Sequence, residues 1–378
     1  MVVKIADSVL TPLGLGTDIN YVSVKQGKMC LKRYEGKWHL PEHFVASMID
    51  DELICRFTGE LRLGDNYTRL EKMAIIVVND AVKRCGINIE NENVVFVFAS
   101  AKGNVHLLVN RNCDNTTLQL PKSAQKVSQW FGNNRFPLVV SNACISGVQA
   151  QIEAWRILQT SYADFVIVVA ADILSPFVIS GFQSFKAVSD DYCRPFDEDR
   201  LGLNLGEAAA CSIYTRFENI EVGKPHWSIV RGAIFNDAYH ISHPSKTAEG
   251  CYLALKNVLG NYACCDISMI NVHGTATMYN DEMEAVALSR AGLLTIPINS
   301  LKGYYGHTMG AAGLLETIIT MAAMDDNTIL GSKGFKNIGV SKSVNIDSNN
   351  RTVKGTYRFI KTVSGFGGCN AAIMYERI

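Results

Sequence analysis

Short, continuous apolar runs alternate along the chain with longer segments whose apolar residues recur at helical spacing. Five runs rich in β-branched and aromatic residues predict buried strands, at 94–98, 136–140, 165–171, 268–272 and 295–298. Apolar spacing predicts helices over 149–160 and 282–291, and 310–324 is apolar nearly all round, which indicates a deeply buried helix. This alternation favours an α/β fold with mostly parallel sheets.

Composition indicates a folded protein without a strong overall charge. Of the 378 residues, 48 % are hydrophobic and only 19 % are charged, so the chain can bury a sizeable core. Lys and Arg together number 36, as do Asp and Glu, and the formal net charge is zero. No global field therefore draws this protein onto nucleic acid or an anionic membrane, and we expect neither as a partner.

The sequence predicts neither a membrane span nor a secretion signal. No segment offers the roughly 18 uninterrupted apolar residues of a membrane helix, and Lys4 and Asp7 interrupt the N-terminal segment too early for a signal peptide. The 11 cysteines are scattered without a Cys-x-x-Cys pair, which favours reduced thiols in a cytoplasmic protein. We expect two halves, 1–220 and 221–378, because each contains a strand, a polar turn and a helix rich in small residues.

Cys144 is the first of three reactive side chains that lie between a predicted strand and a predicted helix. It follows the strand at 136–140 and opens the helix at 149–160. A thiol at a helix N-terminus feels a partial positive charge, so we expect its pKa to be lowered and its thiolate fraction raised. The free N–H groups there could also hold an oxyanion. This position favours a nucleophile over a buried structural cysteine.

Two histidines occupy the same kind of position. His273 follows the strand at 268–272, and Thr275 and Thr277 behind it offer hydroxyl groups to a polar ligand. Asp281 is expected to be the N-cap of the next helix. His307 precedes the helix of small residues, whose N-terminus disfavours the imidazolium form, so we expect a neutral His307.

A glycine-rich turn at 364–370 completes the candidate chemistry. It could present a backbone N–H to an oxyanion, or it could be a tight hairpin. One cysteine and two histidines on glycine-bearing turns favour thioester chemistry over peptide hydrolysis, because a cysteine protease needs one histidine and an orienting Asn or Asp. A metal site built from the same three residues is an alternative, although no closely spaced ligand pair supports it.

Four sequence blocks, in order along the chain, resemble the β-ketoacyl-acyl carrier protein synthases, the condensing enzymes of the thiolase superfamily. They are Asn-Ala-Cys-Ile-Ser-Gly at 142–147, His-Gly-Thr-Ala-Thr at 273–277, Gly-His-Thr-Met-Gly-Ala-Ala-Gly at 306–313 and Gly-Phe-Gly-Gly-Cys-Asn at 365–370. Two histidines are typical of the elongating class of this family. A biosynthetic thiolase would instead carry a second cysteine near Phe366.

The resemblance implies a decarboxylative Claisen condensation. Cys144 would take up an acyl group, and the backbone N–H groups of Cys144 and Phe366 would form the oxyanion hole. Neutral His273 and His307 would donate hydrogen bonds to the thioester carbonyl of a malonyl-acyl carrier protein and stabilise the enolate left by decarboxylation. Phe366 would also be a gate between acylation and condensation.

The remaining site residues are assigned by the same resemblance. Lys302 and Glu284 would orient the histidines and bias their charge, with an ordinary structural ion pair as the alternative. Thr275 and Thr277 resemble the residues that bind the phosphopantetheine arm of the carrier protein. We expect no metal and no tightly bound cofactor, since the carrier's thioester supplies the activation.

The family fold implies five layers, α/β/α/β/α, made of two similar halves, and a dimer in which the strand at 165–171 pairs with its two-fold mate. That dimer is a homodimer or a heterodimer with a related ketosynthase-like subunit. Asn142 and Cys369 stand where threonine is usual, which favours a specialised polyene or polyketide pathway over primary fatty-acid synthesis. The alternatives are a non-condensing, chain-length-factor-like partner subunit and a thioester acyltransferase or hydrolase.

Overall fold

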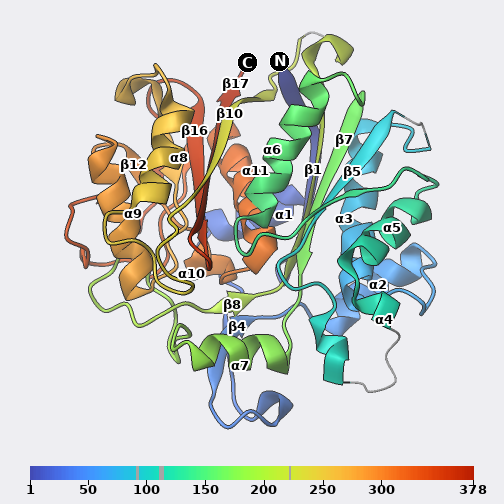
Figure 1. Cartoon of the computed structure of the whole chain (residues 1–378), viewed down its shortest axis with the longest axis horizontal. Helices are drawn as coiled ribbons and strands as arrows, with labels where there is room; N and C mark the ends of the chain where they lie inside the picture. The colour runs from blue at the N-terminus through green and yellow to red at the C-terminus, as the bar shows by residue number, and fades with distance from the viewer. Residues whose placement is uncertain (91–92, 110–114, 221–222) are drawn as a thin grey trace.

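The computed structural model describes residues 1–90, 93–109, 115–220 and 223–378, and its centre is a mixed sheet (Figure 1). Eleven strands of this sheet form one continuous row in which each strand pairs with its neighbours. The strand β2 (Gly14–Leu15) pairs with β1 outside this row. In spatial order the eleven are β14 (Asn345–Ile346), β12 (Pro297–Asn299), β11 (Met269–Asn271), β16 (Arg358–Gly365), β17 (Cys369–Arg377), β10 (Trp227–Asn236), β1 (Val2–Thr11), β9 (Ala208–Arg216), β7 (Phe165–Asp172), β5 (Val94–Ala99) and β6 (Leu138–Val140).

Two small sheets and several helices complete the described part of the chain. The small sheets contain β3 (Lys32–Tyr34), β4 (Phe44–Ser47) and β8 (Leu205–Gly206), and β13 (Thr328–Ile329) with β15 (Arg351–Thr352). The α-helices are α1 (Thr17–Lys25), α2 (Asp51–Glu60), α3 (Arg69–Cys85), α4 (Asn115–Leu118), α5 (Leu120–Trp130), α6 (Ser146–Gln159), α7 (Pro176–Ser184), α8 (Glu249–Leu259), α9 (Met278–Arg290), α10 (Lys302–Tyr305) and α11 (Ala312–Asp325). The 3₁₀ turns are η1 (Lys37–His39), η2 (Val105–Val109), η3 (Phe217–Asn219), η4 (Cys264–Asp266) and η5 (Met309–Ala311).

The prediction of mostly parallel sheets is wrong for the middle of the large sheet. Strands β5, β6 and β7 are parallel at one end, as are β11, β12, β14 and β16 at the other. The strands between them, from β7 through β9, β1, β10 and β17 to β16, pair antiparallel. Strands β16 and β17 form a hairpin joined by the glycine-rich turn, so no crossover helix separates them.

The helices and the two ends of the sheet form five layers, which confirms the expected α/β/α/β/α arrangement. Figure 1 shows α6 and α11 between the two ends of the sheet, α3 and α5 on one outer side and α8 and α9 on the other. The burial of both faces of β7 explains why the sequence at 165–171 is apolar at consecutive positions. Its residues Val166, Val168 and Ala170 face the central helices, and Ile167 and Val169 belong to the outer cluster with α3.

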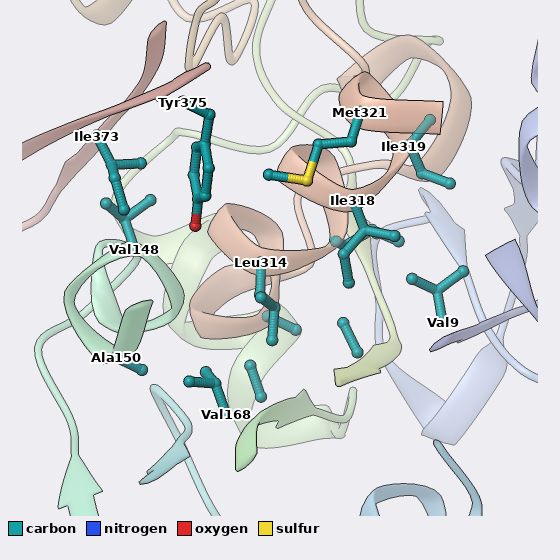
Figure 2. Close-up of a cluster of buried hydrophobic side chains, with 14 of the residues drawn as sticks. Val9, Val148, Ala150, Val168, Leu314, Ile318, Ile319, Met321, Ile373 and Tyr375 are labelled. Carbon is teal, nitrogen blue, oxygen red and sulfur yellow. The ribbon is translucent and has the colours of Figure 1, made fainter. Parts of the chain in front are cut away.

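The central layer is apolar and tightly packed. Figure 2 shows Leu314, Ile318 and Met321 of α11 beside Val148 of α6 and Tyr375 of β17. The predicted deep burial of 310–324 is confirmed, because almost every residue of α11 is buried. Small residues allow this approach of the helices, as the sequence predicted.

Gly313 is a position where the contact between α6 and α11 leaves no room for a side chain. A Cβ atom on Gly313 would lie 2.8 Å from the backbone nitrogen of Val148, so one of the helices would have to shift. We expect Gly313→Ala to lower the free energy of unfolding by about 1–3 kcal/mol. Gly59→Ala in α2 is the matched control, because a Cβ there meets nothing within 4 Å. Thermal unfolding of both variants tests this, and an equal Tm for the two would contradict it.

The predicted strands and helices are located correctly, with errors at their ends. The strands at 94–98 and 165–171 are β5 and β7, and the helices at 149–160 and 282–291 are α6 and α9. The strand at 136–140 is shorter than predicted, because β6 begins at Leu138 and Phe136 is 82 % exposed. Among the described residues, no helix is long and apolar enough to cross a membrane.

The predicted dimer strand is wrong. The strand at 165–171 is β7, which pairs with β5 on one side and with β9 on the other, so it has no free edge for a two-fold mate. Its apolar run reflects a position in the interior of the sheet. The edge strand at this end is β6, whose one pairing partner among the described strands is β5.

Candidate active site

Cys144, His273 and His307 meet at the floor of one cavity. The Sγ atom of Cys144 lies 3.0 Å from Nε2 of His307, and the ring centroids of the two histidines are 4.9 Å apart with the rings nearly perpendicular. All three side chains are buried. One ligand atom from each residue lies within 4.8 Å of those of the other two. The structure therefore brings together a thiol and two imidazoles that are far apart in the sequence.

Cys144 lies on a sharp turn between β6 and α6. Its predecessor, Ala143, has a φ of 45°, in the left-handed region that non-glycine residues seldom adopt, so the chain reverses here at some cost in strain. The turn also touches the C-terminal glycine turn, because a Cβ on Gly365 would lie 3.1 Å from the Cys144 nitrogen. The two departures from the family pattern, Asn142 and Cys369, contact each other, with the Cys369 thiol donating to Asn142 Oδ1 at 3.0 Å.

The predicted lowering of the thiol pKa is wrong. Burial raises the pKa of the Cys144 thiol to about 12, and this effect outweighs the nearby Lys302 ammonium and the hydrogen bond from the Phe366 backbone, which both lower it. The α6 helix begins only at Ser146, and the thiol is excluded from water. A thiolate therefore has to be generated during the reaction, and His307 Nε2 is the base within reach.

His307 is held between α10 and η5 by its own backbone. Its N–H donates to the carbonyl of Asn204 at 2.6 Å, and its carbonyl accepts from the N–H of Gly206 at 3.0 Å. Burial, followed by the Lys302 and Lys361 ammonium groups, holds the pKa of His307 well below the ordinary imidazole value. The predicted neutral state of His307 is confirmed.

His273 has the same electrostatic character. Burial lowers its pKa well below the ordinary imidazole value, and Lys302, His307 and Lys361 lower it further. Nδ1 of His273 and Nδ1 of His307 have no hydrogen-bond partner among the described residues. Two neutral rings can each donate or accept a hydrogen bond, which a catalyst that polarises a carbonyl requires.

Lys302 and Glu284 lie behind the histidines, but they do not pair with each other. The Lys302 ammonium bonds Glu316 at 2.5 Å and the backbone carbonyl of His273 at 3.0 Å. Glu284 accepts from the backbone N–H groups of His273 and Gly274, at 2.7 and 2.6 Å. Both residues thus fix the main chain that carries His273 rather than its ring, and a Lys302–Glu284 ion pair is absent among the described contacts.

Thr275 and Thr277 lie on the wall of the cavity, with their hydroxyl oxygens 3.0 Å apart. The prediction that Asp281 caps the next helix is wrong. Thr277 is the N-cap of α9, and its side chain accepts from the N–H of Asn280. The Asp281 carboxylate instead accepts from the backbone N–H groups of Thr275 and Ala276, and so it shapes the loop that presents the two threonines.

The cavity has a volume of about 560 Å³ and an aromatic wall formed around Phe366. The Phe366 ring stacks on Phe182 at 5.6 Å between centroids and meets the edge of Phe185 at 5.4 Å. Its backbone hydrogen-bonds the Cys144 thiol. Phe366 therefore combines a backbone donor at the sulfur with a side chain on the path into the site.

Sequence reasoning missed two buried residues of the site, Glu316 and Lys361. Glu316 bonds both Lys302 and Lys361, each at 2.5 Å. Each could have been found, because Glu316 is the only charged residue in the otherwise apolar segment 310–324, and Lys361 interrupts the apolar strand β16. A charge within a buried apolar segment requires a buried partner.

The metal-site alternative is disfavoured by the charges behind the site. Three donor atoms from Cys144, His273 and His307 are close enough together to bind an ion. However, the ammonium groups of Lys302 and Lys361 are both buried directly behind the histidines, with only the Glu316 carboxylate between them. Both ammonium groups oppose positive charge at the histidine rings, so they also disfavour a divalent cation there.

Comparisons with known proteins agree with this geometry. The structure of this chain resembles that of a β-ketoacyl synthase from Burkholderia phymatum, with a TM-score of 0.87, 23 % identity and coverage of 100 % of this chain and 99 % of that one. The ishigamide ketosynthase/chain length factor gives a TM-score of 0.86 at 19 % identity, covering 99 % and 98 %. These likenesses show the fold.

Sequence relatives and family models identify the family. A putative mitochondrial 3-oxoacyl-[acyl-carrier-protein] synthase of Schizosaccharomyces pombe is 24 % identical over 97 % of both chains. The 3-oxoacyl-[acyl-carrier-protein] synthase 2 of Coxiella burnetii is 29 % identical over 63 % of this chain and 61 % of its own. Residues 2–218 match the model of the β-ketoacyl synthase N-terminal domain and residues 227–336 that of the C-terminal domain. The chain therefore belongs to the β-ketoacyl synthase family.

Proposed function

We propose that this protein elongates an acyl chain by decarboxylative Claisen condensation of an acyl group on Cys144 with a malonyl thioester on an acyl carrier protein. The observation that carries the proposal is the convergence of the Cys144 sulfur and two neutral imidazoles in one cavity. A hydrolase or simple acyltransferase needs one base beside the nucleophile. A second neutral imidazole has a use when a second carbonyl must be polarised.

The first step is acyl transfer. As the Cys144 sulfur attacks the acyl thioester, His307 Nε2 accepts the thiol proton across 3.0 Å. The backbone N–H groups of Cys144 and Phe366 hold the oxyanion, and one such donor is worth about 3 kcal/mol. Collapse of the intermediate breaks the bond to the carrier's sulfur, which leaves with the proton from His307. The acylated enzyme then has two neutral histidines again.

The second step forms the carbon–carbon bond. His273 and His307 donate hydrogen bonds to the thioester carbonyl of the malonyl group, and carbon dioxide leaves as the enolate forms. The enolate carbon attacks the carbonyl on Cys144, and the sulfur is expelled as a thiolate that takes up a proton from water. The product is a β-ketoacyl thioester on the carrier. No bound cofactor is required.

The cavity is suited to a substrate that arrives on a flexible arm. Thr275 and Thr277 line its wall and would bind the amide groups of phosphopantetheine. Large side chains with more than half their surface exposed line its mouth, which would face the carrier protein. They are Phe185, Leu201, Ile241, Met278 and Tyr279.

We also propose that the chain dimerises through the edge of β6. Phe136 and Leu138 are 82 % and 40 % exposed at this edge, which an isolated protein would leave unpaired and apolar. We expect the parent to have twice its 41.5 kDa mass by light scattering and Phe136→Asp to be monomeric. Ile19→Asp, on the exposed face of α1, is the control and should stay dimeric.

A monomeric parent would contradict self-pairing. A ketosynthase of Xenorhabdus doucetiae is known in complex with its chain length factor. In that case the same edge would require a second, related subunit, and adding candidate subunits to the light-scattering experiment would identify it. The intact Cys144 and both histidines favour the condensing subunit of any such pair over the non-condensing one.

Product analysis tests the proposed function. The protein is incubated with acyl- and malonyl-loaded carrier protein, and the carrier is examined by intact mass. We expect a β-ketoacyl carrier that forms only when both substrates are present. Acylation of Cys144 followed by release of the free acid, without any condensed product, would identify a hydrolase and refute the proposal.

A further inference from the structure

We propose that Lys361 is a positioning residue of the condensation, and that as the second cation on Glu316 it adds to burial in keeping His273 and His307 neutral. This inference rests on the proposed condensation for its kinetic consequence. Its electrostatic core concerns the ionisation of the two rings and can be measured without turnover.

Hydrogen bonds connect Lys361 to Glu316 and to the segment that carries His273. Glu316 is 1 % exposed, and its two carboxylate oxygens bond the ammonium groups of Lys302 and Lys361, each at 2.5 Å. Lys361 also donates to the backbone carbonyl of Val272 at 3.2 Å, and Lys302 to that of His273 at 3.0 Å. The two lysines thus grip neighbouring carbonyls of the segment that carries His273.

One lysine would be enough to neutralise Glu316. The second is fully buried, and burial lowers the pKa of Lys361 to about 8 although Glu316 raises it. Burying an extra ammonium group is costly, so its retention needs a compensating role or tight hydrogen bonding. With both lysines charged, Lys302, Glu316 and Lys361 together have two positive charges and one negative charge, and the Glu284 carboxylate on the His273 backbone is a further acidic group beside them.

The two ammonium groups act on both imidazoles. Lys302 and Lys361 lower the pKa of His273 and of His307, after the larger effect of burial. Positive charge behind a neutral ring raises the free energy of its imidazolium form. The same charge stabilises the enolate that develops in front of the rings.

Other charged groups near the site are left unsubstituted in every variant. The Glu284 carboxylate of α9 accepts a hydrogen bond from the His273 backbone, and burial raises the pKa of Glu284 while Lys361 lowers it. Asp281 of α9 binds the loop at 275–276. Asp172 of β7 and Lys102 act on Cys144. Because these groups are present in every variant, differences in ionisation between variants report on the Lys302–Glu316–Lys361 group together with the response of Glu284, whose pKa Lys361 lowers.

Three variants change the net charge of this group in steps. The parent has a charge of +1, Lys361→Met gives 0, Glu316→Gln gives +2, and the double variant Glu316→Gln/Lys361→Met returns to +1. The rings are followed by NMR titration of ¹³C-labelled histidine in the whole protein. We expect the pKa values of His273 and His307 to rise by about one pH unit in Lys361→Met, to fall in Glu316→Gln and to return towards the parent in the double variant.

The pH at which the condensation rate falls on acidification should shift together with the pKa values of His273 and His307. In the parent it lies well below the ordinary imidazole range, since protonation removes the neutral rings only at low pH. In Lys361→Met it should move to higher pH by about the same one unit. Lys361→Arg keeps the charge and should keep the parental profile. If Lys361→Met does not fold, Glu316→Gln, which keeps both lysines, tests the same dependence with the opposite sign.

A purely structural role for Lys361 predicts a different pattern. All variants would then lose stability and rate at every pH, the double variant most of all, and the histidine titrations would not follow the charge series. That result would overturn the inference. A parent that fails to condense, with histidine titrations that do follow the series, would refute the proposed function and leave the electrostatic role of Lys361 intact.

Discussion

Cys144→Ala should lower the formation of β-ketoacyl product by about 10⁴-fold or more, because Cys144 supplies the only thiol among the described residues that line the cavity. The variant should still release carbon dioxide from malonyl-carrier, since His273 and His307, which polarise the malonyl carbonyl, do not need the sulfur. Its fold should be unchanged, because alanine fits into the space that the larger side chain of the buried Cys144 occupies. Measuring carbon dioxide and condensed product separately distinguishes the two effects.

One result would contradict this prediction. Persistent condensation in Cys144→Ala would show that another group holds the acyl chain, and the site assignment would then be wrong. Of the other described cysteines, Cys369 is the one on the adjoining glycine turn, so Cys369→Ala is the matched control. It should keep most of the condensation activity.

Replacing the histidines separately should divide the two half-reactions. His307→Ala should slow acylation, because it removes the base 3.0 Å from the thiol, whose pKa of about 12 leaves almost no thiolate at neutral pH. It should also slow condensation by about 10²–10³-fold, as the loss of one donor to a developing oxyanion does. His273→Ala should slow condensation to a similar degree and leave acylation nearly unchanged.

Single-turnover kinetics separate these steps. Acylation is followed as the mass increase of the protein with acyl-carrier alone, and condensation as its loss after malonyl-carrier is added to the preformed acyl-enzyme. Equal slowing of acylation in His273→Ala and His307→Ala would mean that the 3.0 Å contact to Cys144 has no special role as a base. His106→Ala is a control outside the cavity, since His106 does not line it.

The reactive residues were predictable from the sequence because local structure places them. Cys144, His273 and His307 each follow a strand or a glycine turn and precede a helix, and such positions present side chains to a cavity. The convergence of these three residues was not predictable, because the strands that carry them do not end side by side at one edge of the sheet. Strands β6 and β11 lie towards opposite ends of the sheet, and only the packing of both ends around α6 and α11 brings the turns together.

Three of the errors and omissions share a physical origin, since each concerns burial in the tertiary structure. The helix N-terminus favoured an acidic thiol at Cys144, but exclusion from water dominates its pKa. The apolar run at 165–171 fitted a dimer strand, whereas its two neighbours in the sheet account for it. Lys361 and Glu316 were passed over because a charged residue in an apolar segment gives no sign of its partner until the chain is folded.

The most direct test of the condensation is the stoichiometry of a single turnover. Protein acylated on Cys144 is mixed with malonyl-carrier whose free carboxyl group is ¹³C-labelled, and the acyl-enzyme, labelled carbon dioxide and β-ketoacyl carrier are measured together. We predict that one labelled carbon dioxide and one β-ketoacyl carrier appear for each acyl group lost from Cys144. Loss of the acyl group as free acid, with no matching release of label, would contradict the account.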